Sequence, residues 1–189
     1  QLAPDMRHQG VIAYAAPVAY ASLDDVFACA EEKGEPPLLL LLDEIEDPHN
    51  FGALLRTADA AGVHGVLVPE RRGCALTATV AKTSAGAVEH VRVVRIGNIV
   101  QEMKRLKERG LWFVGADMAG DEDMFHADLT GPLCIVVGSE GKGLGRLVKE
   151  TCDFLVRIPM HGAINSLNAS VAGALLMYEA RRARLLGRA

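Results

Sequence analysis

Long apolar runs and paired cysteines are both missing from this sequence of 189 residues, and each absence excludes a class of protein. No apolar run approaches the ~20 residues that a membrane-spanning helix requires. The four cysteines are far apart and form no C-x-x-C pair, so a zinc site is not expected. They are predicted to be reduced, mostly buried thiols of a cytosolic protein: Cys29, Cys74, Cys134 and Cys152.

An excess of positive charge and a secretory leader are missing as well. The sequence has 20 Lys and Arg residues against 24 Asp and Glu residues, which gives a net charge of −4. Any contact with a polyanion must then come from local basic patches, or from a part that this sequence does not contain. The first five residues lack the charged and then apolar stretch of a signal peptide, so no leader is expected. No His, Cys and Asp cluster has the spacing of metal ligands, and no metal is expected either.

The stretch of residues 134–176 organises the rest of the chain. It begins with an apolar run that ends at Gly138, which is typical of a buried strand. The next loop, up to Gly145, has four glycines in eight residues, and glycine lets a backbone approach another backbone or a ligand closely. After a second short strand at 154–158, the polar sequence at 165–168 opens a long helix. A strand end, a loop and a helix start are therefore expected to converge on a small molecule.

A nucleoside triphosphate site is one competing interpretation of the glycine loop. That site requires the pattern G-x-x-x-x-G-K-S/T. Gly138 and Gly143 have the spacing, but Leu144 and Gly145 stand where Lys and Ser or Thr are needed. Glu140 inside the loop would also repel phosphate. A glycine-rich turn that binds no ligand is the other alternative.

Strands and helices alternate along the remainder of the chain. Residues 38–42 are a continuous apolar run, which is typical of a strand buried on both faces of a parallel sheet. Further strands are predicted at 11–15, 66–68, 91–96 and 111–116, and helices at 22–30, 51–61, 79–87 and 98–109. Residues 118–130 are predicted to be an acidic surface connection. The alternation predicts a doubly wound α/β domain with a mostly parallel sheet.

The C-terminal helix is predicted to start near Ser166, with Ser166 as its N-cap, and to end near Leu186. An apolar stripe at helical spacing marks one face as core or dimer interface: Leu167, Val171, Ala174, Leu175 and Tyr178. The arginines at its end are explained by a favourable interaction with the helix dipole, so they need no nucleic acid partner. Arg71 and Arg72 lie in a loop and are candidates for contact with phosphate, although exposed loop charges are common.

Three motifs follow one another along the chain. The first is LLLLLDEIEDPHNFGALLRTADAAGVHGVLVP at 38–69, which contains an Asn-x-Gly-x-x-x-Arg pattern from Asn50 to Arg56. The others are GSEGKGLG from Gly138, followed by RIPM and INSLNASVAGALL. In this order they resemble the SpoU (TrmH-like) family of RNA ribose methyltransferases, part of the SPOUT superfamily. The match is most similar to the 23S rRNA guanosine 2′-O-methyltransferase subgroup, with tRNA enzymes next.

The resemblance implies a fold and an organisation that pattern alone does not predict. It implies a deep trefoil knot formed by the loops 138–145 and 158–165 and the start of the helix at Ser166. It also implies a homodimer that pairs through the C-terminal helices. Residues 38–189 would be the catalytic domain and residues 1–37 an arm or linker. The sequence His8-Gln9-Gly10 resembles the segment that follows an N-terminal RNA-binding domain in two-domain relatives, so such a domain is expected before it.

The resemblance further implies S-adenosylmethionine as cofactor and a ribose 2′-hydroxyl of RNA as methyl acceptor. Gly138, Ile158 and Leu167 match cofactor positions of the family, and Met160 is a neighbour. Backbone groups of glycine-rich or apolar turns can hold an adenine, so conspicuous side chains are not needed there.

The same resemblance places Arg56 at the proposed catalytic position of the family. Since a guanidinium is too weakly acidic to be an ordinary base, Arg56 is predicted to position a phosphate that helps remove the hydroxyl proton. Four further residues would orient Arg56, the ribose and the cofactor: Asn50, Glu140, Ser166 and Asn168.

Four of these five residues also have a simpler structural interpretation. Arg56 suits a solvated helix position, Glu140 a loop-stabilising acceptor, Ser166 an N-cap and Asn168 a first-turn polar residue. Two other functions stay open: a knotted enzyme that methylates a base, and a non-catalytic RNA-binding scaffold. The combination of these residues with Asn50 favours ribose methylation.

Overall fold

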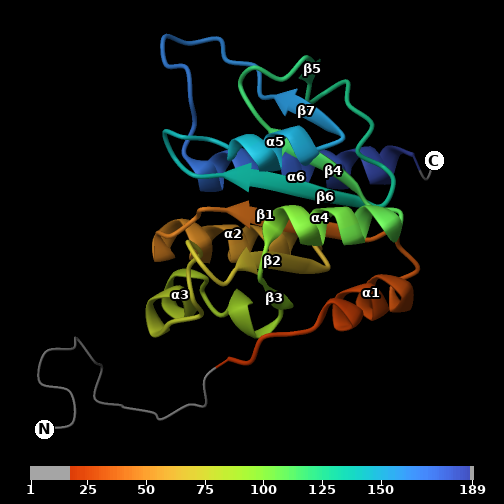
Figure 1. Ribbon diagram of the computed structural model, residues 1–189, viewed down its shortest axis with the longest axis vertical. Helices are drawn as coiled ribbons and strands as arrows, with labels where there is room; N and C mark the ends of the chain where they lie inside the picture. Colours follow the sequence, from red (N-terminus) through yellow and green to blue (C-terminus); the bar gives the residue numbers. More distant parts are fainter. Residues whose placement is uncertain (1–17, 188–189) are drawn as a thin grey trace, which may run out of the picture.

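The computed structural model describes residues 18–187, and their core is one parallel sheet covered by helices on both faces (Figure 1). Within this part of the chain the sheet has seven strands in the order β3-β2-β1-β6-β4-β7-β5. The strands are β1 (Leu38–Asp43), β2 (Gly65–Pro69), β3 (Val93–Ile96), β4 (Trp112–Ala116), β5 (Glu122–Asp123), β6 (Leu133–Gly138) and β7 (Phe154–Arg157). The predicted doubly wound α/β fold is confirmed.

The two central strands, β1 and β6, pair in parallel register from Leu38 with Leu133 to Asp43 with Gly138. Every residue of both strands is buried. Successive side chains of a strand point to opposite faces, so Leu40 packs on one core layer and Leu41 on the other. This double burial explains why β1 is an unbroken run of leucine rather than an alternating pattern.

The helices form two layers. One face of the sheet is covered by α2 (Pro48–Ala61), α3 (Ala78–Thr83) and α6 (Ala169–Leu186), with the 3-10 turn η1 (Ala87–Glu89) beside them. The other face is covered by α1 (Leu23–Glu32), α4 (Ile99–Glu108) and α5 (Arg146–Thr151). On this second face Val26 of α1 packs so closely that a Cβ at Gly65 would come within 2.4 Å of it.

Several boundaries differ from the prediction. The C-terminal helix begins at Ala169 rather than near Ser166, because Asn168 is its N-cap and accepts hydrogen bonds from the backbone N–H groups of Ser170 and Val171. Helix α2 begins at Pro48, capped by the Asp47 side chain, and not at Phe51. The helix predicted at 79–87 ends at Thr83, since the backbone adopts a left-handed conformation at residues 85 and 86 before η1. The acidic connection contains β5, and α5 was missed.

The apolar stripe of α6 is exposed rather than part of the core of this chain. Val171, Leu175 and Tyr178 keep 45%, 39% and 52% of their surface exposed. The buried positions of this helix are instead Gly173, Leu176 and their neighbours along the same face, which pack on α2 and the sheet. Of the two alternatives for this stripe, the core is therefore excluded at these three positions, and the dimer interface stays a prediction.

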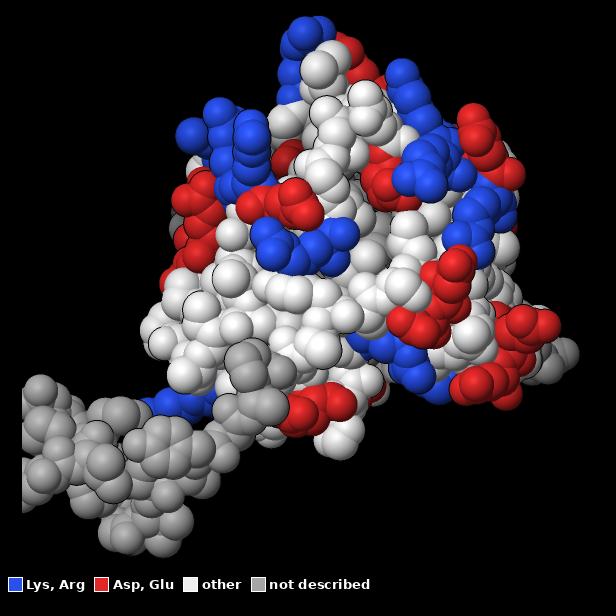
Figure 2. Space-filling view, turned by 60° about the horizontal axis from the view of Figure 1, so that its bottom comes forward, with Lys and Arg blue, Asp and Glu red and all other residues white. Residues whose placement is uncertain are grey.

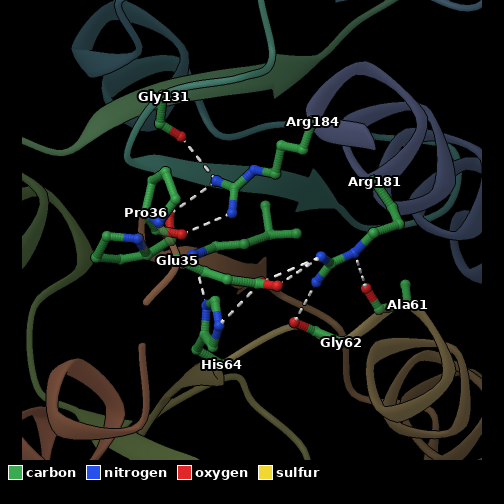
Figure 3. A network of polar contacts seen from close by, with 10 residues as sticks. Glu35, Pro36, Ala61, Gly62, His64, Gly131, Arg181 and Arg184 are labelled. Carbon is green, nitrogen blue, oxygen red and sulfur yellow. Dashed lines mark hydrogen bonds and ion pairs between the residues drawn. The ribbon is translucent and has the colours of Figure 1, made fainter. Parts of the chain in front are cut away.

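The end of α6 is anchored at the amino-terminal edge of the sheet (Figure 3). Arg184 is buried and donates to the carbonyls of Pro36 (2.6 Å), Pro37 (3.0 Å) and Gly131 (2.7 Å). Arg181 donates to the carbonyls of Ala61 and Gly62 and to the carboxylate of Glu35. These arginines thus bind loop carbonyls directly, which is more specific than the interaction with the helix dipole that the sequence predicts.

Within residues 18–187, no helix combines the length and the apolar character needed to cross a membrane. The strand predicted at 11–15 and the His8-Gln9-Gly10 segment lie outside the described residues. The trefoil knot stays a prediction of the family resemblance.

Candidate active site

The carboxyl-terminal edge of the sheet opens into a cavity of about 540 Å³, which we call the large cavity. It is bounded by the ends of β4, β6 and β7, the glycine loop and the segment before α6. Its wall consists of Ala116, Asp117, Met118, Val137, Gly138, Ser139, Glu140, Gly141, Lys142, Gly143, Val156, Ile158, Met160, Asn165, Ser166, Leu167, Ala169 and Ala172. All four residues predicted to bind a cofactor are in this wall.

The glycine loop folds back tightly over the end of β6. The backbone N–H of Gly143 donates to the carbonyl of Ser139 at 2.9 Å, and Gly141 and Gly143 have φ angles of 79° and 67°. A Cβ at Gly138 would lie 2.2 Å from the carbonyl carbon of Gly143. These positions therefore need glycine, either for the left-handed backbone or for the close approach.

A buried carboxylate that sequence reasoning missed fixes the far end of this loop. Asp43 is the last residue of β1 and only 4% exposed, and its Oδ2 accepts a hydrogen bond from the backbone N–H of Gly145 at 2.7 Å. Burial raises the pKa of Asp43 above its ordinary value, and the hydrogen bond from Gly145 opposes that rise. The available signal was the position of an acid at the end of an apolar strand, at the edge where parallel strands place ligand sites.

Three of the predicted catalytic residues form one hydrogen-bonded cluster. Asn50 lies in the first turn of α2, Glu140 in the glycine loop, and Asn168 caps α6. Asn50 Nδ2 donates to Glu140 Oε1 at 3.1 Å, and Asn168 Nδ2 donates to Asn50 Oδ1 at 2.9 Å and also to Glu140 Oε1. The structure therefore joins the three sequence motifs through one polar residue each.

The helix caps hold the two amides of this cluster in place. The Asp47 side chain accepts a hydrogen bond from the backbone N–H of Asn50 at 2.9 Å. Asn168 Oδ1 accepts from the backbone N–H and the hydroxyl of Ser170 at 2.9 and 2.6 Å. Because this oxygen is engaged by the helix start, the amide nitrogen of Asn168 is directed at Asn50 and Glu140.

A second cavity, of about 290 Å³, lies on the other side of Glu140, and we call it the small cavity. Its wall consists of Glu44, Ile45, Glu46, Asp47, Asn50, Ser139, Glu140 and Lys142. Ser139, Glu140 and Lys142 belong to both cavities. Two molecules, one bound in each cavity, would therefore meet at Glu140. The Oε2 atom of Glu140 accepts no hydrogen bond from residues 18–187.

The two remaining predicted site residues lie apart from the cluster. Ser166 is exposed and lines the large cavity, but its hydroxyl makes no hydrogen bond within the described residues. Arg56 is exposed on α2, lines neither cavity and makes no hydrogen bond or ion pair with residues 18–187. Both side chains are available to a ligand or to another chain.

The geometry of the large cavity suits a nucleoside-like ligand. Its volume falls in the range of cavities that hold small molecules, and most of its side chains are apolar. The glycine loop brings backbone N–H and C=O groups to the wall, which can pair with the edge of a base. Asp117 is already engaged, since it forms an ion pair with Lys149 at 2.9 Å and accepts from the N–H of Ala119.

Residues 37–178 match the model of the SpoU rRNA Methylase family. The protein YacO of Bacillus subtilis, whose name places it in the TrmH family of tRNA/rRNA methyltransferases, is 56% identical over 178 residues. This alignment covers 94% of the present chain and 72% of YacO.

Two solved structures extend the comparison. The SpoU methyltransferase AviRb from Streptomyces viridochromogenes, crystallised with its cofactor S-adenosylmethionine, has a TM-score of 0.76 and 34% identity. The alignment covers 81% of the present chain and 62% of AviRb. An RNA 2′-O ribose methyltransferase has a TM-score of 0.73 and 37% identity, with 79% of the present chain and 57% of the other covered. The chain thus spans less than two thirds of these two structures.

Proposed function

Because the chain belongs to the SpoU rRNA Methylase family, we propose that it transfers a methyl group from S-adenosylmethionine to a ribose 2′-hydroxyl of RNA. The observation that carries this proposal is the contact between the large and small cavities at the Asn50–Glu140–Asn168 cluster. It provides one site for a cofactor, one for an acceptor, and fixed polar groups between them.

The large cavity is the proposed cofactor site, with Gly138, Ile158, Met160 and Leu167 in its wall. When bound, S-adenosylmethionine supplies an electrophilic methyl group. The chain contributes an apolar enclosure, which excludes water. It also contributes backbone groups, which orient the adenine. No metal takes part in this proposal.

The cluster has the task of placing the acceptor hydroxyl. A ribose hydroxyl is a poor nucleophile, so it must be held in line with the methyl group and relieved of its proton. In the proposed arrangement Glu140 Oε2 accepts the hydrogen bond of the hydroxyl, and Asn50 and Asn168 hold the carboxylate in position through Oε1. Ser166 lines the large cavity and orients the cofactor there. The exposed Arg56 positions an RNA phosphate near the acceptor hydroxyl, and this phosphate helps remove the hydroxyl proton.

The preferred substrate in this proposal is 23S rRNA, methylated at a guanosine, and tRNA is the alternative. The family description names rRNA, and the name of YacO includes both RNA classes. We also propose that the reaction takes place in the cytoplasm. On the face shown in Figure 2, Lys and Arg side chains are interspersed with Asp and Glu side chains. This distribution supports contact with RNA through small basic patches rather than through one large basic surface.

We place a homodimer interface on the exposed face of α6. Val171, Leu175 and Tyr178 form an apolar surface there that nothing else in residues 18–187 covers. Substitution of Leu175 by Asp should convert a dimer into a monomer in light scattering, while the far-UV circular dichroism spectrum stays unchanged. Equal masses for the two proteins would remove this part of the proposal.

A methyl-transfer assay with two RNA classes tests the function. The full chain is incubated with methyl-labelled S-adenosylmethionine and either 23S rRNA or total tRNA, and the RNA is then hydrolysed with alkali. A 2′-O-methylated linkage resists alkali, so label in dinucleotides indicates ribose methylation, and label in mononucleotides indicates base methylation. No label with either RNA, although both bind, would favour the non-catalytic scaffold.

A further inference from the structure

A third cavity, of about 480 Å³, lies at the same edge of the sheet. Three arginines line it, and we call it the arginine cavity. Its wall comes from the ends of β1 and β2, the turn before α4 and the start of α5: Asp43, Glu44, Pro69, Arg71, Arg72, Gly97, Asn98, Ile99, Val100, Gly145, Arg146, Leu147 and Val148.

The three cavities lie in a row. Glu44 lines both the arginine cavity and the small cavity, and Glu140 lines both the small and the large cavity. No residue lines both the arginine cavity and the large cavity, so the small cavity lies between them. A linear polymer with one of its monomer units in the small cavity can therefore extend along this edge of the sheet into the arginine cavity.

The three arginines of this cavity are exposed, and one of them, Arg71, has no partner within residues 18–187. Arg71 is exposed and makes no hydrogen bond or ion pair with residues 18–187. The side chains of Arg72 and Arg146 are 74% and 78% exposed and pair only with Glu44 and Glu150. Exposed ion pairs of this kind stabilise little, so a phosphate can replace the carboxylates.

The acidic residues that line the three cavities determine which cavity can bind a phosphate. Four carboxylates and a single lysine line the small cavity, which makes that cavity unfavourable for a phosphate: Glu44, Glu46, Asp47, Glu140 and Lys142. In the arginine cavity the carboxylate of Asp43 accepts from Gly145 and that of Glu44 is paired with Arg72. The backbone N–H groups at the start of α4 add partial positive charge to the same wall.

We propose that the arginine cavity binds a backbone phosphate of the RNA strand whose acceptor nucleotide lies in the small cavity. This inference rests on the proposed function, which it deepens by giving the strand a path. Arg71 and Arg146 contact the phosphate as planar, charged donors. Their contribution is to affinity and register, because phosphate contacts carry no sequence information.

The test is the salt dependence of RNA binding by the double variant Arg71→Ala/Arg146→Ala. The probe is a fluorescein-labelled single-stranded RNA of mixed sequence, followed by anisotropy over a range of salt concentrations. Each phosphate contact to a single strand contributes about 0.7 to the slope of log K against log salt. Because both arginines contact the same phosphate, we expect the slope to decrease by roughly 0.7 and the affinity at low salt to fall about tenfold.

Three controls accompany this measurement. Arg105→Ala removes an arginine of α4 that is also 74% exposed and paired with a nearby glutamate, and it should bind RNA as the unchanged chain does. Arg71→Lys/Arg146→Lys keeps the charge and should restore most of the slope. Calorimetry should give equal affinities for S-adenosylmethionine in all variants.

The outcomes separate the two proposals. If the unchanged chain methylates rRNA and the double Ala variant keeps both its KM and its salt slope, the proposed function stands and the phosphate site is wrong. If no methyl group is transferred but binding depends on Arg71 and Arg146, the site stands and the methyltransferase proposal fails. A slope lowered equally by Arg105→Ala would also overturn the site, since the effect would then be one of overall charge.

Discussion

Helix α6 carries a polar network at each end, and the two networks are built in opposite ways. At its start, Asn168 joins Asn50 and Glu140 at an exposed edge between two cavities. At its end, Arg181 and Arg184 bind carbonyls of interstrand segments, and Arg184 is 3% exposed (Figure 3). Water can replace the bonds of the first network and cannot easily replace those of the second. The end of α6 lies at the amino-terminal edge of the sheet, and its start lies at the carboxyl-terminal edge. The comparison therefore predicts that substitutions at the amino-terminal edge of the sheet unfold the protein and that substitutions at its carboxyl-terminal edge inactivate it.

The largest expected effect is that of Arg184→Ala on stability. This change removes the guanidinium donor from the carbonyls of Pro36, Pro37 and Gly131, of which that of Pro37 keeps a hydrogen bond from the backbone N–H of Leu133. A hydrogen bond to a charged group contributes about 1.5–3 kcal/mol, and because Gly131 is exposed and Pro37 keeps one bond, we expect a loss of roughly 3–5 kcal/mol in the free energy of unfolding. Urea denaturation measures it, with the exposed Arg105→Ala as control at under about 1 kcal/mol. A loss no larger than that of the control would refute the contrast between the two edges.

Substitution of Asn168 should have the second largest effect, and on catalysis rather than stability. Asn168→Asp keeps an oxygen to cap α6 but replaces the donor to Asn50 and Glu140 with a second carboxylate. We expect kcat/KM for methyl transfer to fall about 100- to 1,000-fold, the range found when a preorganised polar group is lost. The free energy of unfolding should change by less than about 1 kcal/mol.

Asn168→Ala removes the cap as well. It should lower both methyl transfer and cofactor affinity, because Leu167 in the cofactor cavity is its neighbour, and cost about 1 kcal/mol of stability. Methyl transfer that survives in Asn168→Asp would show that Asn168 serves only as a helix cap.

The sequence predicted the exposed network far better than the buried one. The resemblance of the three motifs to the family singled out Asn50, Glu140 and Asn168, and the structure brings these three side chains together. Arg184 and His64 have no such pattern, since their partners are backbone groups of distant segments, and a backbone C=O or N–H group has no residue identity. Asp43 was missed for a related reason: its partner is the backbone N–H of Gly145, 102 positions away.

The alternation of strands and helices predicted the fold, since burial on both faces leaves continuous apolar runs such as β1. The start of α6 was misplaced because Ser166 and Asn168 are both good N-caps, and only the close packing of the site decides between them. Likewise, a helical stripe predicts one apolar face but not whether that face packs inside the chain, and Val171, Leu175 and Tyr178 prove to be exposed.

His64 provides a pH test of the amino-terminal edge. It is 1% exposed, and its Nδ1 accepts a hydrogen bond from the backbone N–H of Leu38 at 2.9 Å. The pKa of His64 is lowered to about 4, mainly by burial and in addition by the positive charges of Lys33, Arg184 and Arg181, against the opposing effect of Glu35.

The unfolded chain therefore binds more protons than the folded one between the ordinary pKa of 6.5 and about 4. Stability should decrease by about 3 kcal/mol as the pH falls through this window, and this group should cause no further loss below it. Urea denaturation at pH 7 and at pH 4.5, compared with His64→Gln, measures the effect. Parallel pH profiles for the two proteins would contradict it.

Arg56→Ala asks whether a residue outside both networks takes part in the reaction. We expect methyl transfer to fall about 100-fold, in the range for loss of assisted proton transfer, with cofactor affinity unchanged because Arg56 does not line the large cavity. If turnover falls only in proportion to cofactor affinity, the catalytic assignment is wrong. Arg56 lies apart from the Asn50–Glu140–Asn168 cluster of its own chain, so a mixture of the Arg56→Ala and Asn168→Ala proteins provides a further test. Methyl transfer recovered in the mixture would show that Arg56 of one subunit acts in the site of a second subunit.

Ser166→Ala should have the smallest effect, and it sharpens the comparison within the site itself. Ser166 lines the large cavity two residues before Asn168, but its hydroxyl has no hydrogen-bond partner within residues 18–187. A ligand that uses this hydroxyl would lose one neutral hydrogen bond, which contributes about 0.5–1.5 kcal/mol. We therefore expect methyl transfer to fall by roughly three- to tenfold, with no change in the urea midpoint. Steady-state kinetics with both substrates varied would assign the loss to the cofactor or to RNA. A decrease as large as that of Asn168→Asp would mean that ligands recruit Ser166 into the cluster, and that the hydrogen bonds within this chain understate the extent of the active site.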